Sequence, residues 1–174
     1  MPALRYLPRY TVDDYRCWEG DWELWDGIPV SMTPSPFGRH QQVCRDVLFR
    51  LMVLMRESGC SCEAIHELDW IVDRNTVVRP DVMVLCDGIP ERHITTRPDL
   101  IVEVLSEATK HKDQTAKREL YQREQVPYYF LIDPADATVR GYALQAGQYQ
   151  SIDAPDGRYP IRFADHDCQF VFSV

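Results

Sequence analysis

The sequence predicts an α/β domain: a mixed central sheet flanked by helices, with an N-terminal β-hairpin and a C-terminal antiparallel meander. Residues 100–105 and 128–133 are apolar runs rich in β-branched or aromatic side chains, typical of strands buried on both faces of a sheet. Residues 106–124, between these two runs, predict a helix, and residues 38–58 predict another. A length of 174 residues suits one core and is too short for two ordinary domains, so we expect residues 1–174 to form a single domain.

The N-terminal part predicts a short helix and then a hairpin. Residues 11–18 open with Thr followed three positions later by Asp, the pattern of a capped helix start. Residues 22–25 and 28–32 predict two strands that turn at Asp26-Gly27, a pair of residues favoured in two-residue hairpin loops. Pro29 has no backbone N–H, which places the second strand at an edge or a bulge.

The middle and the C-terminal part carry weaker signals. Residues 63–68, 70–73 and 77–85 predict short strands, and residues 137–174 alternate weakly, as in a peripheral antiparallel meander. Residues 38–58 have apolar side chains at steps of three and four, so one stripe of this helix should face the core. The stripe consists of Val43, Val47, Leu48, Leu51, Leu54 and Met55.

The charge balance is acidic, with 19 Lys and Arg against 27 Asp and Glu and a net charge of −8. Proteins that bind nucleic acid tightly usually have a basic surface, so this balance argues against an efficient stand-alone DNA-cutting enzyme. No apolar run approaches the roughly 20 residues of a membrane span, and the N-terminus lacks the apolar core of a signal peptide. We therefore expect a cytoplasmic protein without membrane contact.

The six cysteines are expected to be reduced thiols, because no export signal precedes them. They are Cys17, Cys44, Cys60, Cys62, Cys86 and Cys168. A zinc site built from Cys60, Cys62 and His66 is an alternative, but no fourth ligand follows at a recognisable spacing.

The candidate site centres on Glu103, a carboxylate within the apolar run of residues 100–105. A buried Glu needs a group that compensates its charge. Asp81 lies in a second strand-like run, and antiparallel pairing of the two runs would bring both carboxylates to one face. Two neighbouring carboxylates favour the binding of a divalent cation, Mg²⁺ or Mn²⁺, which neutralises their charge. The alternative is structural: Asp81 ends a turn and Glu103 pairs with an arginine such as Arg79.

Several phrases of the sequence match a known family in order and spacing. They are Asp26-Gly27, Met32, Pro34, His40, Arg79-Pro80-Asp81, Pro98 to Ser106, Asp113…Lys117…Tyr121, and Val126 to Pro134. Together they resemble the Uma family of putative restriction endonucleases, a branch of the PD-(D/E)xK nuclease superfamily. The resemblance implies a restriction-endonuclease-like fold, a Mg²⁺ or Mn²⁺ site on Asp81 and Glu103, and hydrolysis of phosphodiester bonds in nucleic acid, most simply DNA. Cutting both strands of a duplex would favour a two-fold homodimer.

The sequence departs from the superfamily at Leu105, the position two residues after the Glu that usually carries Lys. The resemblance then implies Lys117, in the following helix, as the replacement, so the predicted catalytic residues are Asp81, Glu103 and Lys117. Asp113, Lys117 and Tyr121 are spaced by four and share one stripe of a helix. Pointed at Glu103 this stripe would be a wall of the site; pointed outward it would be a solvated face in which Lys117 pairs with Asp113.

Auxiliary candidates are Glu23, His40, Asp113 and Tyr121. Glu23 shares a strand face with Trp25 and would add a third carboxylate or orient a water on the metal, although solvent exposure is the alternative. His40 lies on the first turn of its helix, where it would approach a phosphate. Other polar residues are predicted to be structural or exposed, namely Asp99, Ser106, Asp133, His66, His93, His111 and His166.

Two functions of different classes follow. The first is a metal-dependent endonuclease with a migrated lysine. The alternative is a catalytically inactive or partner-dependent interaction module on the same fold, which the acidic charge balance favours.

Overall fold

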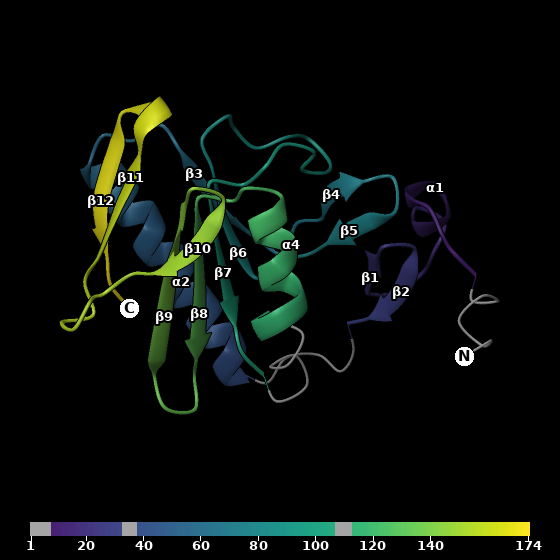
Figure 1. The fold of residues 1–174 in the computed structure, drawn as a ribbon, viewed down its shortest axis with the longest axis horizontal. Helices are drawn as coiled ribbons and strands as arrows, with labels where there is room; N and C mark the ends of the chain where they lie inside the picture. Colours follow the sequence, from purple (N-terminus) through teal and green to yellow (C-terminus); the bar gives the residue numbers. More distant parts are fainter. Residues whose placement is uncertain (1–7, 33–37, 107–112) are drawn as a thin grey trace.

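The protein is described by a computed structural model that covers residues 8–32, 38–106 and 113–174. A six-stranded mixed sheet forms the centre, a four-stranded sheet lies at one end, and a two-stranded sheet covers part of one face (Figure 1). The predicted α/β class with a mixed sheet is therefore confirmed. Within the described residues, the helices lack a stretch that is long and apolar enough to cross a membrane.

The six-stranded sheet has the strand order β10-β9-β8-β7-β6-β3. Its strands are β3 (Glu63–His66), β6 (Val82–Leu85), β7 (Leu100–Val104), β8 (Tyr128–Asp133), β9 (Thr138–Gln145) and β10 (Gln148–Ser151). Only β7 and β8 run parallel, and the other neighbours are antiparallel. A parallel pair needs a crossover connection, which here contains a π-helix, η2 (Asp113–Lys117), and the helix α4 (Arg118–Arg123).

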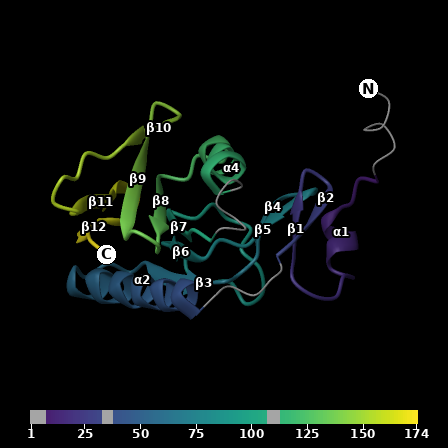
Figure 2. The ribbon, with the colours of Figure 1, turned by 90° about the horizontal axis from the view of Figure 1, so that it is seen from below.

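Helices lie on both faces of this sheet, α2 (Gly38–Glu57) on one side and α4 on the other (Figure 2). The predicted stripe of α2 faces the sheet, with Val47, Leu51 and Met55 fully buried, and the helix stops just before Gly59, which has a φ of 70°. The large helix and its stripe were thus predicted correctly from apolar spacing.

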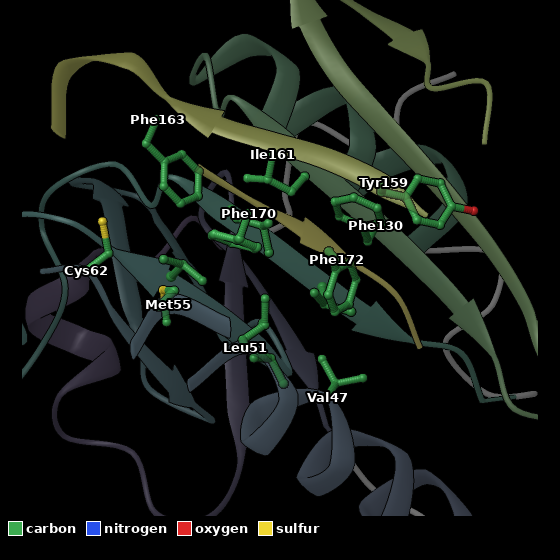
Figure 3. Packing of buried hydrophobic residues seen from close by; sticks show 14 of the residues in the cluster. Val47, Leu51, Met55, Cys62, Phe130, Tyr159, Ile161, Phe163, Phe170 and Phe172 are labelled. Carbon is green, nitrogen blue, oxygen red and sulfur yellow. The ribbon is translucent and has the colours of Figure 1, made fainter. Parts of the chain in front are cut away.

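The C-terminal strands are antiparallel, as predicted, but they are not peripheral. β9 and β10 extend the central sheet, while β11 (Tyr159–Phe163) and β12 (Cys168–Phe172) form a separate pair whose burial alternates residue by residue. Figure 3 shows their aromatic side chains packed together with Phe130 and with the buried face of α2. The core therefore needs this segment, which the weak alternation of the sequence did not reveal.

The four-stranded sheet has the order β2-β1-β5-β4. Its strands are β1 (Trp22–Trp25), β2 (Ile28–Ser31), β4 (Trp70–Asp73) and β5 (Thr76–Val78), and the helix α1 (Val12–Tyr15) precedes them with a complete capping box at Thr11. Asp26 and Gly27 both have positive φ angles, as a type I′ hairpin turn requires. Pro29 lies in the edge strand, so the place of the hairpin and the edge position of its second strand were predicted correctly.

Two predicted elements differ in the structure. Residues 77–85 are not one strand: β5 and β6 belong to different sheets and are separated by Arg79-Pro80-Asp81. Pro80 cannot donate a ladder hydrogen bond, so the chain leaves one sheet there and enters the next. The helix predicted from residue 106 is described only from residue 113, so the proposed cap of Ser106 on residues 107–109 lies outside the described residues, as does His111.

The expectation of six reduced cysteines is wrong for four of them. Cys60 is bonded to Cys168 and Cys62 to Cys86, while Cys17 and Cys44 are free thiols. The alternative zinc site of Cys60, Cys62 and His66 is not formed, because both sulfurs are bonded to other cysteines.

Gly141 in β9 leaves room for two aromatic rings. A Cβ added there would lie 2.6 Å from Cε1 of Phe130 and 2.9 Å from Cδ1 of Tyr159. We expect Gly141→Ala to lower the free energy of unfolding by about 1–3 kcal/mol, because the rings must shift in a packed core. Urea denaturation measures the change, and Gly38→Ala is the control, since nothing lies within 4 Å of its added Cβ. Equal stabilities of the two variants would contradict the prediction.

Candidate active site

A buried ion cluster lies where the end of β7, the crossover helix and β1 meet. The Lys117 ammonium lies between two carboxylates, with Nζ 3.0 Å from Oε1 of Glu103 and 3.2 Å from Oε1 of Glu23. Tyr121, one helical turn further on, donates its hydroxyl proton to the same Glu103 oxygen at 2.6 Å. Lys117 and Tyr121 therefore point inward at Glu103, which is the orientation that a site wall requires.

Lys117 is the last residue of the π-helix η2. Single-turn π-helices are rare and occur often at functional sites, because the wider turn redirects a side chain. The side chain of Asp113, the third member of the predicted stripe, lies outside the described residues, so its pairing with Lys117 is not described.

The cluster is almost fully removed from water. Glu103 is 1% exposed, Glu23 4% and Lys117 6%. Buried charges of this kind are tolerated when they are paired and hydrogen-bonded. Burial and the nearby charge of Glu103 raise the pKa of Tyr121 well above its usual value, so its hydroxyl remains a proton donor.

Glu23 is held by two further donors. The backbone N–H of Arg79 donates to its Oε1 and the indole N–H of Trp25 to its Oε2, each at 2.9 Å. Of the two alternatives for Glu23, solvent exposure is therefore wrong. The sequence placed Glu23 and Trp25 on one face of the strand but did not show that they bond.

The structural alternative for Glu103 is also wrong. The guanidinium of Arg79 pairs with Asp69 at 2.8 Å and with Asp21 at 2.9 Å. Among the described residues, Lys117 brings its ammonium to within 3.0 Å of Glu103.

Asp81 lies directly beside the Glu103 segment. The antiparallel register pairs Val82 with Val102, which puts Asp81 opposite Glu103, and Oδ2 of Asp81 accepts from the N–H of Val104 at 2.7 Å. The carboxylate turns toward α2, where Nε2 of His40 lies 3.4 Å from the same oxygen. The predicted pairing of the two segments is thus present, but the Asp81 carboxylate contacts His40 of α2, whereas that of Glu103 contacts Lys117 and Tyr121. The meeting of the two carboxylates on one face stays a prediction.

His40 and Cys44 extend the site along α2. Sγ of Cys44 lies 3.5 Å from Nδ1 of His40, and the possible ligand atoms of His40, Cys44 and Asp81 all lie within 4.8 Å of one another. Burial, with the negative charges of Asp81 and Glu103, raises the pKa of Cys44, so its thiol stays protonated. Cys44 was not predicted as a site residue, although its position four residues after His40, on the same helix face, was a signal.

The donors fit a hard divalent cation. Asp81 and Glu103 offer carboxylate oxygens, which suit Mg²⁺ or Mn²⁺, whereas the imidazole of His40 suits softer cations and the protonated thiol of Cys44 is not a ligand. The Lys117 ammonium contacts two carboxylates, those of Glu103 and Glu23. Among the described residues, Asp81 forms a group of possible ligands with His40 and Cys44, and the pairing of Asp81 with Glu103 as metal ligands stays a prediction.

The mixed sheet with helices on both faces defines an α/β fold. A crystal structure of "a putative nuclease belonging to DUF820" from Anabaena variabilis ATCC 29413 has this fold, with a TM-score of 0.73, 20% identity, and coverage of 88% of this chain and 89% of that chain. The Uma2 family, described as "Putative restriction endonuclease", matches residues 12–164, and the chain belongs to this family. A search of curated proteins finds no match.

Proposed function

We propose that this protein is a Mg²⁺- or Mn²⁺-dependent endonuclease that hydrolyses phosphodiester bonds in nucleic acid, with DNA as the expected substrate. The observation that carries the proposal is the Lys117 ammonium, held between the buried carboxylates of Glu103 and Glu23. Asp81 bonds to the N–H of Val104, the residue that follows Glu103. Membership of a family of putative restriction endonucleases supports it.

Each residue has a role that follows from its contacts. Asp81 and Glu103 would hold the cation, which when bound polarises a phosphate and lowers the pKa of a bound water. Lys117 brings a fixed positive charge next to the reacting phosphate, where negative charge develops. Tyr121 orients the Glu103 carboxylate through its hydrogen bond, and Glu23 positions the Lys117 ammonium.

His40 and Asp113 remain auxiliary candidates, His40 because of a described contact and Asp113 because of its spacing in the sequence. His40 contacts Asp81 and would orient this carboxylate from the side of α2. For Asp113 the proposal rests on the four-residue spacing to Lys117 alone. We also propose a single domain, a two-fold dimer and a cytoplasmic location. The two disulfides argue against a cytoplasmic location, because cytosolic thiols are kept reduced.

The net charge of −8 favours a second candidate, an inactive or partner-dependent interaction module on the same fold. Such a module would keep Lys117 paired with Glu103 and Glu23 and would not bind a cation at Asp81. Calorimetric titration with Mn²⁺ separates the two, since only the endonuclease should give a binding isotherm that Asp81→Asn weakens.

Cleavage of supercoiled plasmid DNA with Mn²⁺ tests the first candidate. We expect Asp81→Asn to lower the cleavage rate by about a hundredfold or more, because it removes one of two charged metal ligands while keeping the acceptor for the Val104 N–H. Asp46→Asn, at an exposed position of α2 whose carboxylate pairs with Arg45, should cut like the wild type. Equal cleavage by the wild type and Asp81→Asn would remove the claim of activity.

A further inference from the structure

A second cluster of ligand-type side chains lies at the opposite end of β6 and β7 from Asp81 and Glu103. Cys86 follows the last residue of β6, Asp99 precedes the first residue of β7, and His166 ends the short 3₁₀-helix η3 (Ala164–His166) between β11 and β12. One possible ligand atom from each of the three lies within 4.8 Å of the other two. Three segments that are distant in sequence therefore converge here.

Asp99 gives this cluster its negative charge. Its side chain is buried, its Oδ2 accepts from the backbone N–H of Cys86 at 2.9 Å, and Arg97 approaches its Oδ1 only to 4.0 Å. Desolvation raises the pKa of Asp99, against the opposing effects of the Cys86 hydrogen bond and of His166. A buried carboxylate that is only partly compensated favours a cation beside it.

The three side chains are zinc ligands by type. Thiolate, imidazole and carboxylate bind Zn²⁺, and three protein ligands leave a fourth position for water. The sulfur of Cys86 is bonded to Cys62 in the structure, so it cannot act as a ligand in this oxidised form. Reduction of that bond would free the sulfur of Cys86 as a ligand.

We propose that the reduced chain binds Zn²⁺, or a divalent cation of similar softness, through Cys86, Asp99 and His166, and that the Cys62–Cys86 disulfide closes this site. A dithiol reductant supplies two electrons and two protons to the disulfide, which becomes two thiols, while the dithiol becomes a disulfide. Cys86 then releases its proton to water as its thiolate binds the cation. The proposal does not depend on nuclease activity.

Titration of the full chain with Co²⁺, a coloured substitute for Zn²⁺, tests the proposal. After reduction with a phosphine, which is oxidised to its oxide and then removed, one Co²⁺ per chain should produce a sulfur-to-cobalt charge-transfer band that Zn²⁺ abolishes. The unreduced chain should show no such band. Cys62→Ser should show the band without any reductant, because Cys86 then has no disulfide partner.

Matched variants locate the thiolate. In the reduced chain we expect Cys86→Ser to lose the band, and His166→Ala and Asp99→Asn to weaken Co²⁺ affinity by roughly tenfold or more, since even partners outside the ligand set change affinity by this much. Cys44→Ser should retain the band, which separates this site from the His40–Cys44–Asp81 group. A double variant, Cys60→Ser with Cys168→Ser, should show no band before reduction.

The proposal is overturned by a reduced wild-type chain without the band, by a band that survives Cys86→Ser, or by a band lost in Cys44→Ser. Unchanged Co²⁺ affinity in His166→Ala would indicate a site made of cysteines alone. That result would also overturn the proposal. A cation at Asp81 and Glu103 has no thiolate ligand, so a failed endonuclease proposal would leave the charge-transfer result unchanged.

Discussion

Replacing Lys117 by Met is expected to lower the free energy of unfolding by about 3–5 kcal/mol, because it leaves two buried carboxylates without their shared cation. Glu103 would keep the hydrogen bond from Tyr121, and Glu23 those from Arg79 and Trp25. None of these neutral donors replaces the ammonium charge. Urea denaturation with linear extrapolation measures the loss.

Arg123→Met is the matched control, since Arg123 lies on the same helix but is exposed and pairs with Glu124 at the surface. Its effect should stay within about 0.5 kcal/mol. Adding Glu103→Gln to Lys117→Met should recover part of the lost stability, because one buried charge is removed. If Lys117→Met and Arg123→Met were equally stable, the buried pairing would not be the stabilising contact that its geometry indicates.

The same substitution also bears on activity. Lys117→Met should lower the rate of Mn²⁺-dependent DNA cleavage by about 10²–10³-fold, the usual cost of removing a group that stabilises developing negative charge. Lys117→Arg keeps the charge but changes the shape of the donor, so it should recover more stability than activity. Comparison of the two variants separates the structural role of the charge from its proposed catalytic role.

Local signals predicted much of the fold. The hairpin turn at Asp26-Gly27 and the apolar stripe of α2 depend on residues that are close in sequence, and the structure has both where they were expected. The division of residues 77–85 between two sheets depends on which distant strands pair with each half. Pro80 was the only local sign of that break.

The sequence of the C-terminal strands carries an alternation of apolar and polar residues that was too weak to predict their place in the core. The strands β11 and β12 alternate buried and exposed residues throughout, as a sheet covering a core must. The buried partners of these strands come from α2 and β8, far away in sequence. Alternation alone did not show that this pair closes the main core.

In the candidate site, too, some residues were predicted from local spacing and others were not. The four-residue spacing of Lys117 and Tyr121 and the single Glu103 in an apolar strand predicted side chains that the structure brings together. The indole of Trp25 and the thiol of Cys44 were missed as partners. Cys86 and His166 are distant in sequence and lie close together only in the folded chain. The pairing of six cysteines cannot be deduced from their positions in a sequence.

Removing the Cys60–Cys168 disulfide, by Cys60→Ser with Cys168→Ser, is expected to lower the free energy of unfolding by about 4–5 kcal/mol. The bond joins residues 108 positions apart, and a crosslink over so long a loop strongly restricts the unfolded chain. It also ties the end of α2 to the first residue of β12, whose aromatic neighbours complete the core. Urea denaturation under non-reducing conditions measures the difference.

The second disulfide is the internal comparison. Cys62 and Cys86 are separated by 24 positions, so their removal should cost less, about 3–4 kcal/mol. Cys17→Ser, at an exposed free thiol, should leave stability unchanged. Reduction of the wild type should remove most of the difference from the Cys60→Ser, Cys168→Ser variant, because the chain entropy of both is then alike. A wild type whose stability does not change on reduction would contradict the entropic argument, whatever the effect of the serines.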